Sequence, residues 1–218
     1  KLTMKNLGIV NHKNNKKKIT IINNSKNLGE FKNMNNILSK SKSKWFTWMA
    51  DDDLMHYDYL REGINLLKKY ENKNVIALYS NYEQGKKINT EFQKNKSIKT
   101  IKLLNFKNFC HMYTGKKIPL LGCYGIIKTK ILKDISGHPH LGNSFGPYSD
   151  TFLPLMLSNK GKLIWIDTKY IFLRTHHGSQ SVSSTNSEAY STAEIDFLNG
   201  FNKICKEKKI SGPIKKQY

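Results

Sequence analysis

Residues 45–53 read Trp-Phe-Thr-Trp-Met-Ala-Asp-Asp-Asp, an apolar, aromatic run that ends in three consecutive carboxylates. The run is short and apolar, which is typical of a buried strand and predicts a central strand of a parallel sheet. Adjacent carboxylates repel one another and are costly to desolvate unless a cation or hydrogen-bond donors compensate. A divalent metal ion would compensate, because hard cations prefer carboxylate oxygen. A solvated turn whose acids cap the next helix is the alternative, and the triplet alone does not separate the two.

The segments on either side of this run alternate between strand and helix patterns. Upstream, Ile19–Ile22 predicts a short buried strand, and apolar residues then recur at helical spacing over Phe31–Leu38. Downstream, Tyr57–Leu67 has the pattern of an amphipathic helix, and Val75–Tyr79 predicts the next strand. This alternation predicts an α/β fold with a mixed, mostly parallel sheet flanked by helices.

The second half of the chain continues the alternation with shorter elements. Residues 137–148 predict a loop because they are rich in Gly, His and Pro. Leu163–Ile166 and Tyr170–Leu173 predict a pair of strands joined by a turn at Asp167–Lys169. We expect one domain over residues 1–184 and a helical C-terminal tail over residues 185–218.

The composition narrows the class of protein. Hydrophobic residues make up 38% and aromatic residues 11% of the 218 residues, which indicates a globular chain with a sizeable core. No apolar stretch in the sequence is long enough to span a bilayer. The three cysteines, Cys110, Cys123 and Cys205, are too widely spaced for a zinc pair and are odd in number, which favours a reducing cytoplasm.

The net charge of +21 points to an anionic partner or to compositional drift. The lysines are dispersed along the chain, and we find no zinc-finger spacing and no nucleic-acid motif. We therefore do not expect nucleic acid as a partner. Peripheral attraction to an anionic membrane surface would be a consequence of the charge.

Four sequence pieces occur in a fixed order. An Asn27-Leu28-Gly29 turn and helix precede the acidic triplet, and Tyr148-Ser149-Asp150 later opens an apolar helix that ends at Gly161. The segment from Arg174 to Ser181 then reads Arg-Thr-His-His-Gly-Ser-Gln-Ser. This ordered series resembles the inverting family-2 glycosyltransferases of GT-A fold, over about residues 18–184.

The resemblance implies a metal site at the acidic triplet. Mn²⁺ or Mg²⁺ held by Asp51, Asp53 and His176 would neutralise the diphosphate leaving group of a nucleotide-sugar donor. Asp53 is the first choice for direct metal contact, and Ala50 stands where many relatives carry the first Asp of the motif. The resemblance also implies a set of donor-binding residues, which are Asp52, Asn27, Asn33, Arg174, His177 and Ser179.

Asp150 is the candidate general base by the same resemblance. It would accept the proton of the acceptor hydroxyl as the new glycosidic bond forms. An ordinary helix N-cap is the alternative for Asp150, and Ser149 stands where the family often has an acidic neighbour. Tyr148 and His140 are the candidate acceptor-binding residues, whereas the sequence around Pro139 predicts solvent exposure for both His138 and His140.

The expected activity is metal-dependent, inverting transfer of a sugar to a glycan or a lipid-linked acceptor, in the cytoplasm or on the inner face of the membrane. Members of that family usually begin with a strand-helix-strand unit that binds the nucleotide, and residues 1–18 show no such unit, so we expect an N-terminally truncated domain. Two alternatives are a nucleotidyltransferase and a cationic protein that binds nucleic acid or a membrane surface. The first would need a Gly-rich basic loop near its start, and the second leaves the acidic triplet unexplained.

Overall fold

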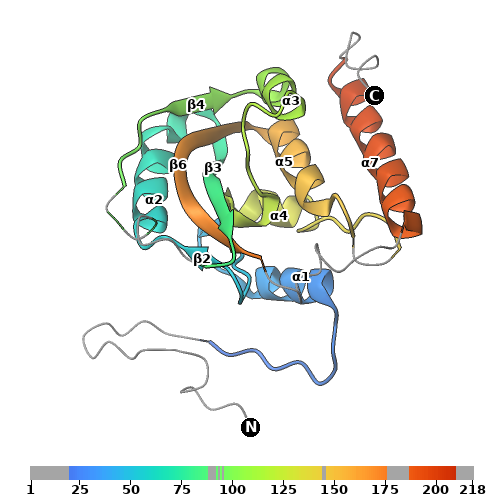
Figure 1. The fold of residues 1–218 in the computed structure, drawn as a ribbon. Coiled ribbons are helices and arrows are strands. Elements are labelled where there is room, and N and C mark those ends of the chain that lie inside the picture. Colours follow the sequence, from blue (N-terminus) through green and yellow to red (C-terminus); the bar gives the residue numbers. More distant parts are fainter. Residues whose placement is uncertain are drawn as a thin grey trace.

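The computed structural model describes residues 20–87, 92, 94, 96–143, 146–175 and 187–209, which form a mixed α/β fold around a curled sheet (Figure 1). Six strands make up the sheet, in the order β1-β5-β3-β6-β2, with β4 also paired to β6. The strands are β1 (Trp45–Phe46), β2 (Leu54–Met55), β3 (Val75–Gly85), β4 (Ile101–Leu104), β5 (Ile126–Lys128) and β6 (Lys162–Arg174).

The sheet is mostly antiparallel, so the prediction of a mostly parallel sheet was wrong. β3 and β6 run parallel to each other, whereas β1–β5, β3–β5, β2–β6 and β4–β6 are all antiparallel pairs. The apolar runs reflect burial on both faces of the sheet. A strand can be buried in this way whether its neighbours are parallel or antiparallel. The direction of each strand is set by the connections between strands.

β6 is one continuous strand and not the predicted pair joined by a turn. Both halves pair in parallel with β3, and the register between the two strands shifts where Ser80 to Tyr82 face Ile166 to Ile171. The residues between the halves, Asp167–Lys169, therefore form an irregularity within the strand. They contain no Gly or Pro, and the turn-favouring Asp167 instead accepts the backbone N–H of Thr100 at 3.0 Å.

The aromatic run before the acids is only partly a strand. β1 covers two residues, Trp45 and Phe46, and lies at one end of the strand order, so the prediction of a central parallel strand was wrong. The upstream prediction over Ile19–Ile22 also fails, because the described residues 20–22 form no strand and Ile21 is exposed. A strand requires a neighbour for its backbone hydrogen bonds, which local apolarity cannot supply.

Helices cover both faces of the sheet (Figure 1). Helix α2 (Tyr59–Lys69) packs on one face with β3, β5 and β6. The other face is covered by five helices: α1 (Glu30–Lys40), α3 (Phe106–Thr114), α4 (Thr129–Asp134), α5 (Ser149–Lys160) and α7 (Ser187–Glu207). The described residues also form the 3₁₀ turns η2 (Glu71–Lys73) and η4 (Gly122–Tyr124).

The helix predictions are confirmed in the positions that matter for the site. Helix α1 follows the Asn-Leu-Gly turn, and α5 begins at Ser149 and is capped by Gly161. Helix α7 packs against α5 through the rings of Phe197 and Phe152, whose centroids lie 5.4 Å apart. The division into a domain and a tail stays a prediction.

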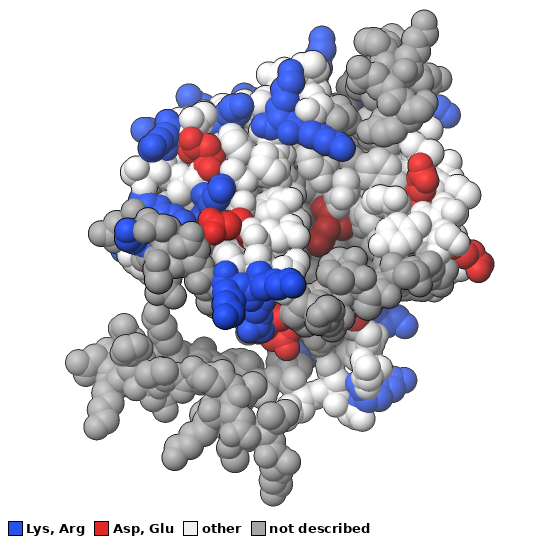
Figure 2. Space-filling model, in the orientation of Figure 1, with Lys and Arg blue, Asp and Glu red and all other residues white. Residues whose placement is uncertain are grey.

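The cations are spread over the surface. Figure 2 shows Lys and Arg side chains on several parts of the visible face, with acidic side chains between them and in a hollow near its middle. Within the described residues, no helix is both long and apolar enough to cross a membrane.

Candidate functional site

The short turn η4 contacts two of the predicted acidic residues through consecutive side chains. Cys123 donates its backbone N–H to Asp150 Oδ1 at 3.1 Å, and its thiol lies 3.7 Å from Asp150 Oδ2. Tyr124 donates its hydroxyl to Asp53 Oδ2. The acidic motif after β1 and the start of α5 are therefore held by the same turn.

Gly122 allows this close approach. A Cβ at position 122 would lie 2.2 Å from the backbone oxygen of Asp150, so the turn and the first residues of α5 meet backbone to backbone. Tyr148, at the N-cap of α5, has a left-handed backbone with φ of 64°, which is rare for an aromatic residue. The chain thus enters α5 through a strained residue that directs Asp150 toward the turn.

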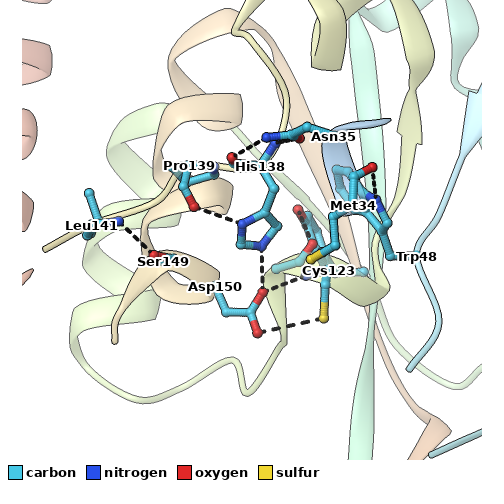
Figure 3. Close-up of polar contacts among 11 residues, drawn as sticks. Met34, Asn35, Trp48, Cys123, His138, Pro139, Leu141, Ser149 and Asp150 are labelled. Atoms are coloured by element: carbon cyan, nitrogen blue, oxygen red, sulfur yellow. Dashed lines mark hydrogen bonds and ion pairs between the residues drawn. The ribbon is translucent and has the colours of Figure 1, made fainter. Parts of the chain in front are cut away.

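His138 is the residue that completes the surroundings of Asp150 (Figure 3). Its Nε2 lies 2.8 Å from Asp150 Oδ1, and its Nδ1 lies 2.9 Å from the carbonyl oxygen of Pro139. His138 is only 3% exposed, so the prediction of a solvent-exposed loop histidine was wrong. The neighbouring Pro139 made the segment look like a surface loop, but the loop folds inward against α1.

Helix α1 holds the backbone of His138 in place. The Asn35 amide accepts the backbone N–H of His138 at 2.8 Å and donates to its carbonyl oxygen at 3.1 Å. Gly137 precedes it with φ of +84°, and a Cβ there would lie 2.1 Å from the Asn35 oxygen. The buried hydroxyl of Ser149 closes the other end of the loop by accepting the N–H of Leu141 at 2.9 Å.

The electrostatics place further charges around this pair. Loss of solvation and the negative charge of Asp150 raise the pKa of Glu30; the charge of Asp52 adds to this, and His138 and His140 oppose it. Glu30 opens α1, so the first turn of that helix and the first turn of α5 present their acids to one region. Burial, followed by the charge of Asp150, raises the pKa of Cys123 well above that of an ordinary thiol. Cys123 therefore stays protonated and acts as a donor.

The three residues of the acidic triplet differ in exposure and in hydrogen bonding. Asp51 is exposed, whereas Asp52 and Asp53 are half-buried. Asp53 Oδ1 accepts the backbone N–H of Arg174 at 2.9 Å, in addition to the bond from Tyr124 to Oδ2. Among the described residues, no three His, Cys, Asp or Glu side chains gather closely enough to hold a metal ion without other ligands.

The other predicted residues divide between local structure and positions near Asp150. Asn27 accepts the N–H of Gly29 at 2.8 Å and so forms the turn before α1, and the exposed Asn33 bonds Asn24 at 2.9 Å. His140 is stacked on Phe31 with centroids 4.6 Å apart.

Tyr148 is 41% exposed, and its ring lies edge-on to Tyr190 of α7, with centroids 5.9 Å apart. Arg174 is exposed at the end of β6. The predicted roles of His176, His177 and Ser179 fall outside the described residues.

The sequence did not reveal five residues of this site, which are Glu30, Asn35, Cys123, Tyr124 and His138. Each of these five residues lies in a different segment from the acidic residue that it contacts or influences. None is separated from that acid by a spacing that belongs to a known motif. Only the glycines flanking them, Gly122 and Gly137, carried a signal, because glycine in an apolar or loop segment indicates close backbone approach.

The family model for "Glycosyl transferase family 2" matches residues 9–135, a stretch that includes the acidic triplet and η4 but ends before Asp150. No curated protein matches the chain significantly.

Two solved structures share a limited likeness. The structure of S. aureus TarS 1-349 matches 67% of this chain at 15% identity with a TM-score of 0.47, and a structure of S. aureus TarS matches 81% at 13% identity with a TM-score of 0.49. This chain covers 40% and 31% of the lengths of those two chains.

Proposed function

The chain belongs to glycosyl transferase family 2, and from this premise we propose that it moves a sugar from a nucleotide-sugar donor to a hydroxyl of a glycan or lipid-linked acceptor, with inversion. Membership itself implies a sugar donor and an acceptor. The observation that supports the proposal is the η4 turn, which holds the candidate base Asp150 through Cys123 and the candidate diphosphate corner at Asp53 through Tyr124.

Asp150 is suited to general-base catalysis. Its side chain is 47% exposed, so an acceptor hydroxyl can reach it, while Cys123 and His138 fix one of its oxygens. In the reaction, the acceptor oxygen forms a bond to the anomeric carbon, its proton passes to Asp150, and the bond from that carbon to the diphosphate oxygen breaks. Attack from the face opposite the diphosphate inverts the anomeric centre. A positioned base contributes about 10²–10⁴-fold to such a step.

The acidic triplet fits a metal site that the donor completes. Mg²⁺ is commonly bound by one or two carboxylates together with substrate phosphates, so a triplet without a three-residue protein cage is compatible with it. Asp51 is exposed, and each Asp53 oxygen has a second lone pair beyond the hydrogen bond that it accepts. Asp51 and Asp53 would hold Mn²⁺ or Mg²⁺, which would neutralise the charge that develops on the diphosphate.

Donor contacts outside the acids are proposed for Asp52 and Arg174. Asp52 lies close enough to Glu30 to influence its pKa, which places Asp52 in the region that Asp150 also faces. The backbone N–H of Arg174 donates to Asp53, so the Arg174 side chain begins beside the triplet. A phosphate bound at the triplet would pair with this cation. Peripheral attraction to an anionic membrane surface is a further proposal that rests on the net charge of +21.

The test is turnover of a donor panel by the full chain. UDP-glucose, UDP-N-acetylglucosamine, UDP-galactose and GDP-mannose are incubated with MnCl₂, and release of the nucleotide is measured with and without glycan acceptors. We expect Asp150→Asn to lower turnover of the active donor by about 100-fold or more, because the amide cannot accept the proton. Proton NMR of the product gives the anomeric configuration.

Asp134→Asn is the matched control. Asp134 is an exposed carboxylate of α4 paired with Lys130 at 2.9 Å, so its loss leaves the site untouched and turnover should not change. Unchanged turnover in Asp150→Asn would contradict the role of Asp150 as base. A wild-type chain that releases nucleotide from no donor of the panel would contradict the proposed activity.

A further inference from the structure

Both ring nitrogens of His138 face oxygen atoms, and this determines how many protons the ring region holds. Nδ1 lies 2.9 Å from the carbonyl oxygen of Pro139, which can only accept, so Nδ1 carries a hydrogen. Nε2 lies 2.8 Å from Asp150 Oδ1. A bare Nε2 facing an ionised carboxylate would set two lone pairs against each other at hydrogen-bond distance. One further proton therefore lies between His138 and Asp150.

The surroundings favour that proton on the imidazole. Asp150 Oδ1 also accepts the backbone N–H of Cys123 at 3.1 Å, and hydrogen bonds of this kind stabilise an ionised carboxylate. The charged and titratable groups of this region are Asp150 of α5, Cys123 of η4, Glu30 of α1, and Asp52 and His140, which act on Glu30 together with His138 and Asp150. Three of these five are carboxylates, and Cys123 is a neutral thiol, so a hydrogen-bond donor on the His138 ring suits this region.

Packing holds the ring in one orientation. The rings of Phe31 and Trp48 lie against the imidazole, with centroid distances of 5.3 and 5.5 Å. Asn35 fixes the backbone on both its N–H and its carbonyl oxygen. The His138 side chain is 1% exposed, whereas that of Asp150 is 47% exposed. The imidazole is therefore closed to solvent and the carboxylate is open to it.

We propose that His138 is the positioning residue for Asp150: its Nε2–H donates to Oδ1 and fixes it, so that Oδ2 is the oxygen that takes the acceptor's proton. This rests on the proposed function of Asp150. Oδ2 has the longer contact, 3.7 Å to the Cys123 thiol, and stays available to an incoming hydroxyl. During transfer the proton of the acceptor hydroxyl moves to Oδ2, His138 keeps its own proton, and Asp150 later releases the new proton to water.

The first test reads the pair without any substrate. Nitrogen-15 NMR of the imidazoles in the full chain reports the protonation of each ring nitrogen, and His138 is identified as the signal absent from His138→Gln. We expect Nε2 of His138 to carry a hydrogen, as its contact with Asp150 requires. A spectrum with an unprotonated Nε2 at neutral pH would overturn the proposal.

The second test uses variants of different reach, with the panel donor that the wild-type chain turns over. In His138→Gln the side-chain amide nitrogen extends about as far as Nε2 and donates without titrating, whereas His138→Asn is too short to reach Asp150. We expect His138→Asn to lose about tenfold or more in kcat with little change in the donor KM, because only the proton-transfer geometry changes. His138→Gln should recover most of kcat, because its amide still donates to Asp150.

The outcomes separate this inference from the proposed function. Full turnover in Asp150→Asn would exclude Asp150 as the general base. The NMR signal of His138 would still show whether a proton lies between His138 and Asp150. If Asp150→Asn is inactive but His138→Asn has the wild-type kcat, Asp150 remains the base and the positioning role of His138 is excluded. A melting curve for each variant confirms that it is folded before its kcat is compared.

Discussion

Asp53 accepts a hydrogen bond from the backbone N–H of Arg174 at 2.9 Å, which joins the acidic triplet to the last residue of β6. The other oxygen of Asp53 accepts the hydroxyl of Tyr124, a residue that is 5% exposed. Asp53 is therefore a structural tie between three segments as well as a candidate metal ligand, and substitutions at this position can separate the two roles.

Asp53→Asn should preserve the fold and lose the charge. Its amide oxygen can still accept the Arg174 N–H, and its NH₂ can donate to the Tyr124 oxygen, so both contacts survive with the Tyr hydroxyl as acceptor. We expect a melting temperature close to that of the wild type and a loss of Mn²⁺-dependent turnover of about 100-fold or more. EDTA should abolish wild-type turnover and leave the residual rate of the variant unchanged.

Asp53→Ala is the contrasting variant. It removes both hydrogen bonds and should cost about 1–3 kcal/mol of unfolding free energy, measured by urea denaturation. Equal stability of the Ala and Asn variants would show that the ties to Tyr124 and Arg174 contribute nothing. Wild-type turnover in Asp53→Asn would exclude Asp53 as a metal ligand.

Gly122→Ala should disturb the start of α5. The new methyl group would meet the Asp150 backbone at 2.2 Å, a contact that requires the turn or the helix to move. We expect a loss of about 1–3 kcal/mol in unfolding free energy, typical of overpacking, together with lower turnover. Gly85→Ala is the control, because a Cβ there meets its nearest atom at an ordinary 3.4 Å. Similar behaviour of the two variants would argue against a steric requirement at Gly122.

Asn35→Ala should loosen the loop that carries His138. It removes a donor and an acceptor from a part-buried backbone pair, so we expect a loss of about 1–3 kcal/mol in unfolding free energy. Hydrogen exchange at the His138 amide should become faster. The adjacent Asn36→Ala breaks an exposed bond to Asn24 and should be nearly neutral. Equal exchange of the His138 amide in both variants would rule out the Asn35 clamp.

Cys110 should resist alkylation in the folded chain. Burial raises the pKa of its thiol to about 12, so the reactive thiolate is scarce at pH 8.5. Mass spectrometry after iodoacetamide treatment should show Cys110 labelled only once urea unfolds the chain, with the half-buried Cys205 labelled earlier. Rapid labelling of Cys110 without denaturant would contradict its burial.

The sign of the pH effect at Cys110 follows from the same shift. Between the ordinary thiol value of 9.0 and about 12, the unfolded chain releases this proton and the folded chain keeps it. The contribution of Cys110 to stability is thus complete below pH 9 and is lost as the pH rises toward 12. Alkaline urea denaturation of Cys110→Ala, which lacks this proton, should show a shallower decline with pH.

Local patterns predicted most of the helices, because amphipathic spacing and caps act within a few residues. The amphipathic pattern over Tyr57–Leu67 is an example, because helix α2 runs over Tyr59–Lys69. The strands were harder to predict. The edge strand β1, the single long β6 and the antiparallel pairs depend on partners far along the chain, which an apolar run does not reveal.

The candidate site shows the same division. The acidic triplet and Asp150 stood out because the order of motifs along the chain matched a family pattern, and the family is now shown by the match over residues 9–135. His138 was misjudged as exposed, although it is buried against α1 and hydrogen-bonded to Asp150. Neighbours in sequence predict a loop, but only the packing of that loop decides its burial.

The sequence by itself determined the family, the helices and the identity of the acids, since these depend on residue order and on contacts within a few residues. The tertiary structure decided which groups hold those acids. Cys123 and Tyr124 bring the triplet and Asp150 to one turn, and the buried His138 ring contacts Asp150 Oδ1. These contacts span from 12 to 71 residues of chain, and only folding brings such distant groups within hydrogen-bond distance.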